Sequence, residues 1–262
     1  MKRRTFIQST AIATIASGLP SCIGQEKSHV LTFSFDDGFK KSFYKIAEIH
    51  EEYGLSACLN VIATGHMPDF KAIDEWIRPE LMGDFNDWNK LKARGHEIMP
   101  HTWKHLNLTE ISLSHAKENI DKCLDYFSEN LDGYKDEEAI FNYAFLASTP
   151  EIDEYALRRV GAVRTGGWLV MEDTKVNMIP HQQSNITIGA WANGPDNIDD
   201  YVDKTVNDFL ASGGGWMVVC LHGLDNEGWG PVSTTYYDQL LKRLKKIDKL
   251  DILPAGEVVK IA

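Results

Sequence analysis

The chain alternates between short apolar runs and longer segments with apolar side chains at helical spacing. The first pattern predicts buried strands and the second predicts helices. The predicted strands cover residues 30–35, 56–62, 97–99, 139–146, 162–164 and 216–221, and the predicted helices cover residues 39–53, 84–94, 113–130, 149–160, 198–211 and 236–247. Residues 167–195 are less regular, and a strand-like tail follows the last helix. This alternation predicts an α/β fold with βαβ units around a parallel sheet, in one domain.

Polar side chains follow several of the predicted strands where each strand ends. They are Asp36 and Asp37, His101, Asn142 and His222. In parallel α/β folds, ligands bind at the edge of the sheet formed by the carboxyl ends of the strands. We therefore expect these side chains to meet at one site.

Asp36 and Asp37 directly follow the apolar run Val30–Phe35, and Gly38 ends it. Because side chains alternate along a strand, the two carboxylates are expected to point in different directions. That arrangement suits a division of labour, in which one aspartate holds a ligand and the other reacts.

His101 and His105 are candidate metal ligands. If the chain turns helical after Pro100, both rings lie on one face and can share a metal ion. A carboxylate from the aspartate pair would complete a set of two histidines and one aspartate. Sites of this kind in metal hydrolases leave further positions open for water and substrate.

Composition and charge narrow the function classes. The chain has 262 residues, of which 43% are hydrophobic and 25% are charged, and this composition is typical of a globular protein. Its net charge is -11, and no cluster of lysine and arginine follows the first few residues. Nucleic acid is excluded as a partner, because phosphate contacts require local positive charge.

The N-terminus predicts export. Residues 1–22 contain Arg3-Arg4, typical of a twin-arginine signal, and a mildly apolar stretch at 7–19 that is too short to span a membrane. They end in Leu-Pro-Ser-Cys, which resembles a bacterial lipobox with Cys22 as the lipidated residue. Residues 23–29 form a tether. We expect a protein of the periplasm or cell envelope, attached to the membrane only by this lipid.

Three segments carry a family resemblance, in the order Phe33–Gly38, His101–His105 and Leu221–Gly223. They resemble the first, second and last motifs of the polysaccharide deacetylases, the NodB-homology family or carbohydrate esterase family 4. The resemblance covers residues 30–262. It implies a single distorted (β/α)7-type barrel that removes acetyl groups from carbohydrates with a divalent metal. Zinc is the usual metal, and a His2Asp set also tolerates cobalt, nickel or manganese.

The resemblance also implies roles for the polar residues. Asp37, His101 and His105 would bind the metal. Asp36 would be the general base that activates the attacking water, and His222 would be the general acid for the leaving group. A carboxylate and an imidazole are suited to these proton transfers.

The chain departs from the family's third motif, which is typically Arg-x-Pro-Tyr-Gly. The corresponding stretch here is Phe141–Phe145, in which Asn142 and Tyr143 stand among the predicted substrate-binding residues. The missing arginine usually orients the base. Arg164, at the end of the next strand, either substitutes for it or forms an ordinary surface salt bridge.

The carboxylate that would orient His222 is open among three aspartates, Asp173, Asp196 and Asp225.

Tryptophans near the motifs suggest a sugar-binding platform, since sugars stack their C–H faces on indole rings. Trp103 and Trp229 are predicted to line the groove, and Trp216 is predicted to be core. For Trp168 and Trp191 the sequence is compatible with a position in the core and with one in the groove.

The sequence thus predicts a metal-dependent carbohydrate deacetylase acting outside the cytoplasm. Two alternatives remain. The altered third motif is compatible with a hydrolase of the same fold acting on a non-sugar amide or ester. It is also compatible with a catalytically weak, lipid-anchored protein that binds glycans.

Overall fold

The structure is a computed structural model that describes residues 28–73, 75–166, 176–180 and 186–260. The predicted export signal, Cys22, most of the tether, and Trp168 lie outside the described residues. Within the described part of the chain, no helix combines the length and apolar character needed to cross a membrane.

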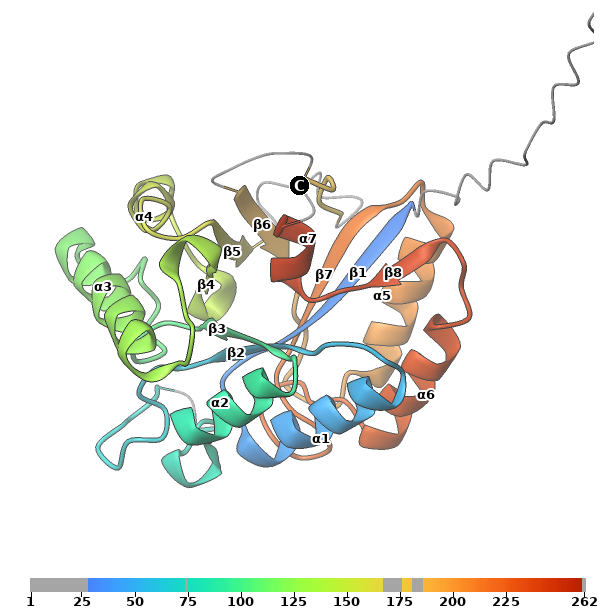
Figure 1. Cartoon of the computed structure of the whole chain (residues 1–262), viewed down its shortest axis with the longest axis horizontal. Helices are drawn as coiled ribbons and strands as arrows, with labels where there is room; N and C mark the ends of the chain where they lie inside the picture. The colour runs from blue at the N-terminus through green and yellow to red at the C-terminus, as the bar shows by residue number, and fades with distance from the viewer. Residues whose placement is uncertain (1–27, 74, 167–175, 181–185, 261–262) are drawn as a thin grey trace, which may run out of the picture.

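The strands of the described residues lie in two parallel sheets (Figure 1). The first seven along the chain are β1 (His29–Phe35), β2 (Cys58–Val61), β3 (Glu97–Pro100), β4 (Ile140–Asn142), β5 (Ala162–Gly166), β6 (Ile186–Ala190) and β7 (Gly215–Leu221). Ladders join β3-β2-β1-β7 and β4-β5-β6. A bridge between Trp191 and Val219 links β6 to β7, and the amide of Asn142 donates to the carbonyl of Pro100 across the gap between β3 and β4. The expected distorted (β/α)7-type barrel is confirmed.

Helices flank these sheets, with α3 and α4 on one side and α5 and α6 on the other (Figure 1). They are α1 (Lys40–Glu52), α2 (Phe85–Ala93), α3 (Leu113–Asn130), α4 (Pro150–Ala156), α5 (Asp199–Ala211) and α6 (Thr234–Leu244). Side chains cap several of them. Asp84 forms a capping box at the start of α2, and Thr149 accepts from the backbone N–H of Ile152 in α4.

Alternation along the strands separates two apolar cores. Leu31, Phe33 and Phe35 of β1 pack outward against the helices. Inward-facing residues, including Trp216 and Val218 of β7, fill the barrel together with apolar residues of a short last helix, α7 (Ala255–Lys260). The next inward position after Val30, Thr32 and Ser34 on β1 is Asp36, so the strand itself aims this carboxylate at the barrel mouth.

The structure differs from the predicted elements at three places. The predicted strand 139–146 ends at Asn142, because Phe145 and Leu146 have φ values of 58° and 51° in a short 3-10 turn and cannot continue a strand. The helix predicted to reach residue 160 ends at Ala156. The tail contains a strand, β8 (Leu250–Ile252), which pairs with β1, but it also contains α7, which was not predicted.

Glu97 is a half-buried residue at the N-terminal end of β3. It accepts hydrogen bonds from the thiol of Cys58 at 3.1 Å and from the backbone N–H of Gly256 at 2.7 Å. Burial raises the pKa of Glu97 from its ordinary 4.5 to about 7. The stability that this group contributes is therefore fully present below pH 4.5 and is lost as the pH rises through about 7.

We expect the free energy of unfolding of Glu97→Gln to lose this pH dependence. Relative to wild type, the variant should gain up to roughly 3 kcal/mol between pH 4.5 and 7. Denaturant unfolding at a series of pH values measures the difference. Glu52→Gln, which changes an exposed carboxylate on α1 away from Glu97, is the matched control and should follow wild type. Parallel pH profiles for Glu97→Gln and wild type would contradict the expectation.

Candidate functional site

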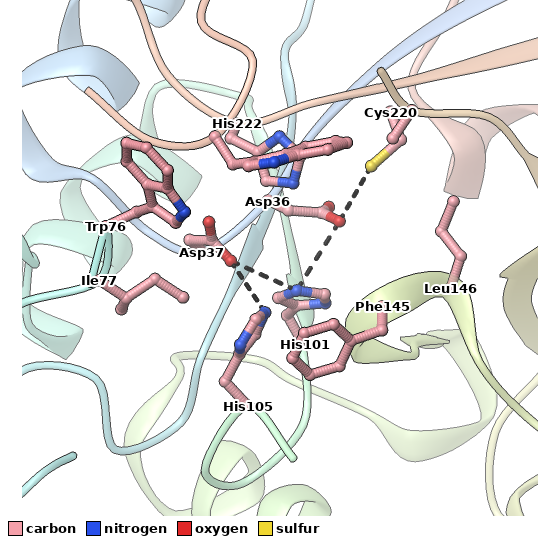
Figure 2. Close-up of a pocket in the computed structure, with 12 residues that line it drawn as sticks. Asp36, Asp37, Trp76, Ile77, His101, His105, Phe145, Leu146, Cys220 and His222 are labelled. Carbon is pink, nitrogen blue, oxygen red and sulfur yellow. Dashed lines mark hydrogen bonds and ion pairs between the residues drawn. The ribbon is translucent and has the colours of Figure 1, made fainter. Parts of the chain in front are cut away.

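Asp37, His101 and His105 converge at the carboxyl ends of β1 and β3. Nε2 of His101 lies 3.5 Å from Oδ1 of Asp37, and Nε2 of His105 lies 3.4 Å from the same oxygen. Figure 2 shows both imidazoles turned toward this carboxylate. All three side chains are buried. The expected grouping of two histidines and one aspartate is therefore present as a spatial cluster.

Residues 101–105 are not helical, so the two histidines do not share a helix face. This stretch is a turn in which Thr102 and His105 have positive φ values of 65° and 52°. The Thr102 hydroxyl accepts a hydrogen bond from the backbone N–H of His105 at 3.1 Å. The left-handed residues bend the chain back so that the two rings face each other, with centroids 5.3 Å apart. Such strained residues often occur where a functional site fixes the backbone.

Asp36 and Asp37 line the same cavity but contact different partners: Arg164 and Asn60 bind Asp36, and the two histidines lie against Asp37. Asp36 follows the inward alternation of β1. Asp37 would face outward on a regular strand, but its φ of 81° turns it back toward the cavity. The chain leaves the strand between the two residues, and alternation no longer applies.

The cluster of Asp37, His101 and His105 fits a divalent cation. Oδ1 of Asp37 is buried, and the Nε2 atoms of both histidines lie 3.4–3.5 Å from it, so three potential ligand atoms surround one point. Nδ1 of His101 is 3.0 Å from the backbone carbonyl of Asn142, which fixes the ring with Nε2 toward Asp37. Ligand histidines in metal sites are held this way. Burial would raise the pKa of Asp37, but hydrogen bonding to His101 and the nearby His105 lower it, so the carboxylate is ionised.

Asp36 lies beside this cluster and is held by three side chains. Arg164 donates to Oδ2 at 2.6 Å, Asn60 donates to Oδ1 at 2.7 Å, and the Cys220 thiol donates to Oδ2 at 3.2 Å. Burial raises the pKa of Asp36, but the guanidinium of Arg164 outweighs it and holds the pKa well below its usual range. Arg164 is only 1% exposed, so the surface salt bridge considered for it is excluded.

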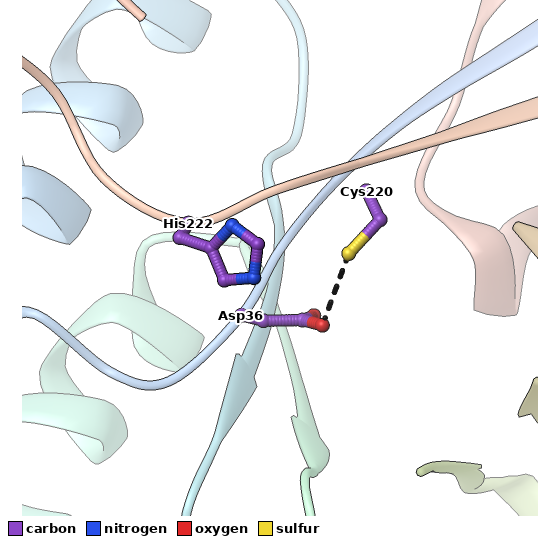
Figure 3. A group of neighbouring side chains, drawn as sticks. All are labelled: Asp36, Cys220 and His222. Atoms are coloured by element: carbon purple, nitrogen blue, oxygen red, sulfur yellow. Dashed lines mark hydrogen bonds between the residues drawn. The ribbon is translucent and has the colours of Figure 1, made fainter. Parts of the chain in front are cut away.

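A second trio, Asp36, Cys220 and His222, also brings three potential ligand atoms together (Figure 3). It fits a cation less well. Arg164 already places a positive charge against Asp36, and burial raises the pKa of the Cys220 thiol well above its ordinary value. A thiol must lose its proton to bind a metal. The first trio is therefore the better metal site.

His222 faces Asp36 and Asp37 from the end of β7. Burial lowers its pKa, against the opposing effect of the two carboxylates. Its ring meets the edge of Trp229, with centroids 5.6 Å apart. Nδ1 is buried and finds no hydrogen-bond partner among the residues that the structure describes.

Of the three aspartates considered as orienting groups, the two that the structure describes do not supply that partner. Asp225 accepts hydrogen bonds from the backbone and hydroxyl of Thr234 instead. Asp196 is exposed. Asp173 lies outside the described residues.

The polar side chains of the site form the floor of a cavity of about 400 Å³: Asp36, Asp37, His101, His105, Cys220 and His222. Its walls are apolar and come from four connections between strands and helices: Trp76, Ile77, Phe145, Leu146, Ala192 and Trp229. Trp229 was predicted to line the groove, and it lines this cavity. Trp103 packs against Tyr126 and Tyr143 packs against Phe141, and neither is among the lining residues. Asn142 and Arg164, which were also predicted to bind substrate, are buried and do not line the cavity.

Sequence reasoning missed Trp76 and Phe145, which are 45% and 46% exposed at the cavity. Trp76 belongs to no periodic apolar pattern, and Phe145 was assigned to the predicted strand 139–146. The available signal was the presence of a large apolar side chain within an otherwise polar loop or next to a strand end. Ser34, Asn60 and Cys220 were missed because inward-facing polar residues on a strand resemble ordinary core positions.

A family model described as polysaccharide deacetylase matches residues 24–161, which is more than half of the chain. Comparison with curated proteins gives no match.

Several solved structures share the fold. The peptidoglycan deacetylase PdaC of Bacillus subtilis is 14% identical with a TM-score of 0.53, and the match covers 89% of this chain and 91% of that one. A putative polysaccharide deacetylase of Mycobacterium smegmatis is 10% identical with a TM-score of 0.57, covering 96% and 93%. A CE4 family pseudoenzyme of Bacillus anthracis is 11% identical with a TM-score of 0.53, covering 91% and 67%.

Proposed function

Because the chain belongs to the polysaccharide deacetylase family, we propose that it is a metal-dependent hydrolase that removes acetyl groups from a carbohydrate outside the cytoplasm. The observation that carries this proposal is the convergence of Asp37, His101 and His105 beside Asp36 and His222 in one cavity. Export and anchoring through Cys22 remain part of the proposal and rest on the twin arginine and the lipobox-like stretch.

Asp37, His101 and His105 would hold the divalent cation, which we take to be zinc and which supplies Lewis-acid polarisation of the acetyl carbonyl when bound. Asp36 remains ionised next to this site, because Arg164 stabilises its negative charge. It can take a proton from the water that attacks the carbonyl carbon.

His222 follows the end of β7, the strand next to β1, and serves the second proton transfer. Burial lowers the pKa of its ring, and a protonated imidazole with a lowered pKa gives up its proton more readily. We assign it the role of general acid, which protonates the leaving nitrogen or oxygen of the sugar. Trp229 packs against the ring and restricts its orientation.

The apolar walls favour a second candidate function. Apart from the floor groups, the cavity lining offers Trp76, Ile77, Phe145, Leu146, Ala192 and Trp229. Aromatic side chains suit the C–H faces of a sugar ring, but walls of this kind also suit a small non-sugar amide or ester. The acyl-transfer chemistry would be the same in both cases.

An acetate-release screen tests the proposal. The purified chain is loaded in turn with zinc, cobalt, nickel or manganese and assayed on acetylated chitin, peptidoglycan, xylan and related oligosaccharides, with small acetylated amides and esters in parallel. We expect metal-dependent acetate release from at least one carbohydrate. Turnover of the non-sugar substrates alone would favour the second candidate. Measurable glycan affinity without acetate release in any metal would instead indicate a glycan-binding protein.

A further inference from the structure

Arg164 and Asn142 stand side by side on neighbouring strands. They are register partners in the parallel ladder between β4 and β5. Partners in such a ladder project their side chains to the same side of the sheet. Nevertheless only Arg164 reaches the proposed base. Its Nη2 donates to Oδ2 of Asp36 at 2.6 Å, and its Nη1 donates to the hydroxyl of Ser34 at 3.2 Å.

Asn142 makes contacts of a different kind. Its side-chain amide donates to the backbone carbonyl of Pro100 at 3.2 Å and ties β4 to β3. Its own backbone carbonyl is 3.0 Å from Nδ1 of His101. The two adjacent positions therefore serve different halves of the site, with Asn142 beside the metal ligands and Arg164 beside the base.

Arg164 has no evident structural reason to be an arginine. Its side chain is 1% exposed, and its Nε is buried without a hydrogen-bond partner among the described residues. Well-packed apolar residues often stabilise a core as well as a buried ion pair does, and a buried donor without a partner calls for another explanation. Arg164 does not line the cavity, so it cannot touch a substrate there.

We propose that Arg164 is the positioning residue for Asp36, and that β5 supplies in this chain the guanidinium that orients the base, while its neighbour on β4 supports the metal ligands. The inference rests on the proposed function, because positioning is meaningful only if Asp36 reacts. Two fixed donors, from Arg164 and Asn60, hold the two carboxylate oxygens and set the plane of the group at the strand end.

Single substitutions at position 164 test this role. We expect Arg164→Asn to lower kcat for acetate release by about 100-fold, the effect typical of a misplaced reacting group. KM and the zinc content should change by less than about threefold, because the metal ligands keep their own supports. Arg159→Asn removes a surface arginine that pairs with aspartates outside the cavity, and it should retain wild-type kcat.

The adjacency of the two positions allows a sharper experiment. In the exchange variant Asn142→Arg/Arg164→Asn, the guanidinium starts one strand away on the same side of the sheet. We expect it to recover kcat by roughly tenfold or more over Arg164→Asn, because neighbouring residues that share one partner couple strongly. If Arg164→Asn does not fold, Arg164→Lys replaces it. Lysine keeps the positive charge but lacks the planar set of N–H donors of a guanidinium. The kcat of Arg164→Lys should therefore fall by about tenfold relative to wild type.

Three results would overturn the inference while leaving the proposed function standing. They are wild-type kcat in a folded, zinc-loaded Arg164→Asn, wild-type kcat in Arg164→Lys, and a folded exchange variant no faster than Arg164→Asn. If wild type releases no acetate from any substrate, the proposed function fails instead. Crystal structures of wild type and Arg164→Asn then decide: a rotated Asp36 carboxylate supports the positioning role, and an unchanged one overturns it.

Discussion

Asp36→Asn is expected to lower kcat for acetate release by roughly 100- to 10,000-fold, the usual contribution of a general base. The amide keeps the shape of the carboxylate but cannot accept a proton from water. Bound zinc should remain at about one per chain, because Asp36 is not among the three proposed ligands. Parallel measurements of acetate release and of metal content separate these two effects.

Stability must be followed in the same variant, because Asp36 neutralises a buried guanidinium. Leaving Arg164 unpaired is expected to cost about 3 kcal/mol or more in the free energy of unfolding. Assays are therefore run well below the melting temperature of the variant. Asp208→Asn, on the exposed surface of α5, is the matched control and should retain both activity and stability. An Asp36→Asn protein that is folded and as active as wild type would contradict the role of Asp36.

His105→Gln is expected to weaken zinc binding by more than the 10- to 100-fold that supporting residues around a metal typically contribute, since His105 is itself a proposed ligand. Acetate release should fall in parallel, and added zinc should restore part of it. A competition titration with a chelator measures the affinity. Removal of metal from wild type by the same chelator should abolish activity reversibly.

His115→Gln provides the control for the loss of a histidine. His115 is exposed on α3, and its loss should alter neither zinc affinity nor acetate release. Unchanged zinc affinity in His105→Gln would place the metal elsewhere. The trio of Asp36, Cys220 and His222 would then be the next candidate.

The sequence predicted the parts of the site that depend on regular structure. Alternation of apolar runs predicted the βαβ series, and the position of Asp36, His101 and His222 after apolar runs predicted that they meet at the carboxyl edge. These inferences succeed because hydrophobic periodicity determines which face of a strand is buried and where the strand ends.

The parts that were not predicted depend on irregular backbone or on long-range contacts. The left-handed conformations of Asp37 and Thr102 determine where the ligand side chains point. The identity of these two residues does not predict a positive φ. The sequence could not predict whether Arg164 contacts Asp36 or lies at the surface. The answer depends on which side of β5 faces the interior of the barrel. Trp76 reaches the cavity from a loop whose path is set by packing of neighbours such as Phe70 and Met82.

The central claim is that one divalent metal, held by Asp37, His101 and His105, is required to remove acetyl groups. Its most direct test is a zinc titration of metal-free protein with acetate release measured at each step. The account predicts a rate that rises in proportion to bound zinc and reaches its plateau at about one ion per chain. A rate that is the same in metal-free and zinc-loaded protein would contradict it.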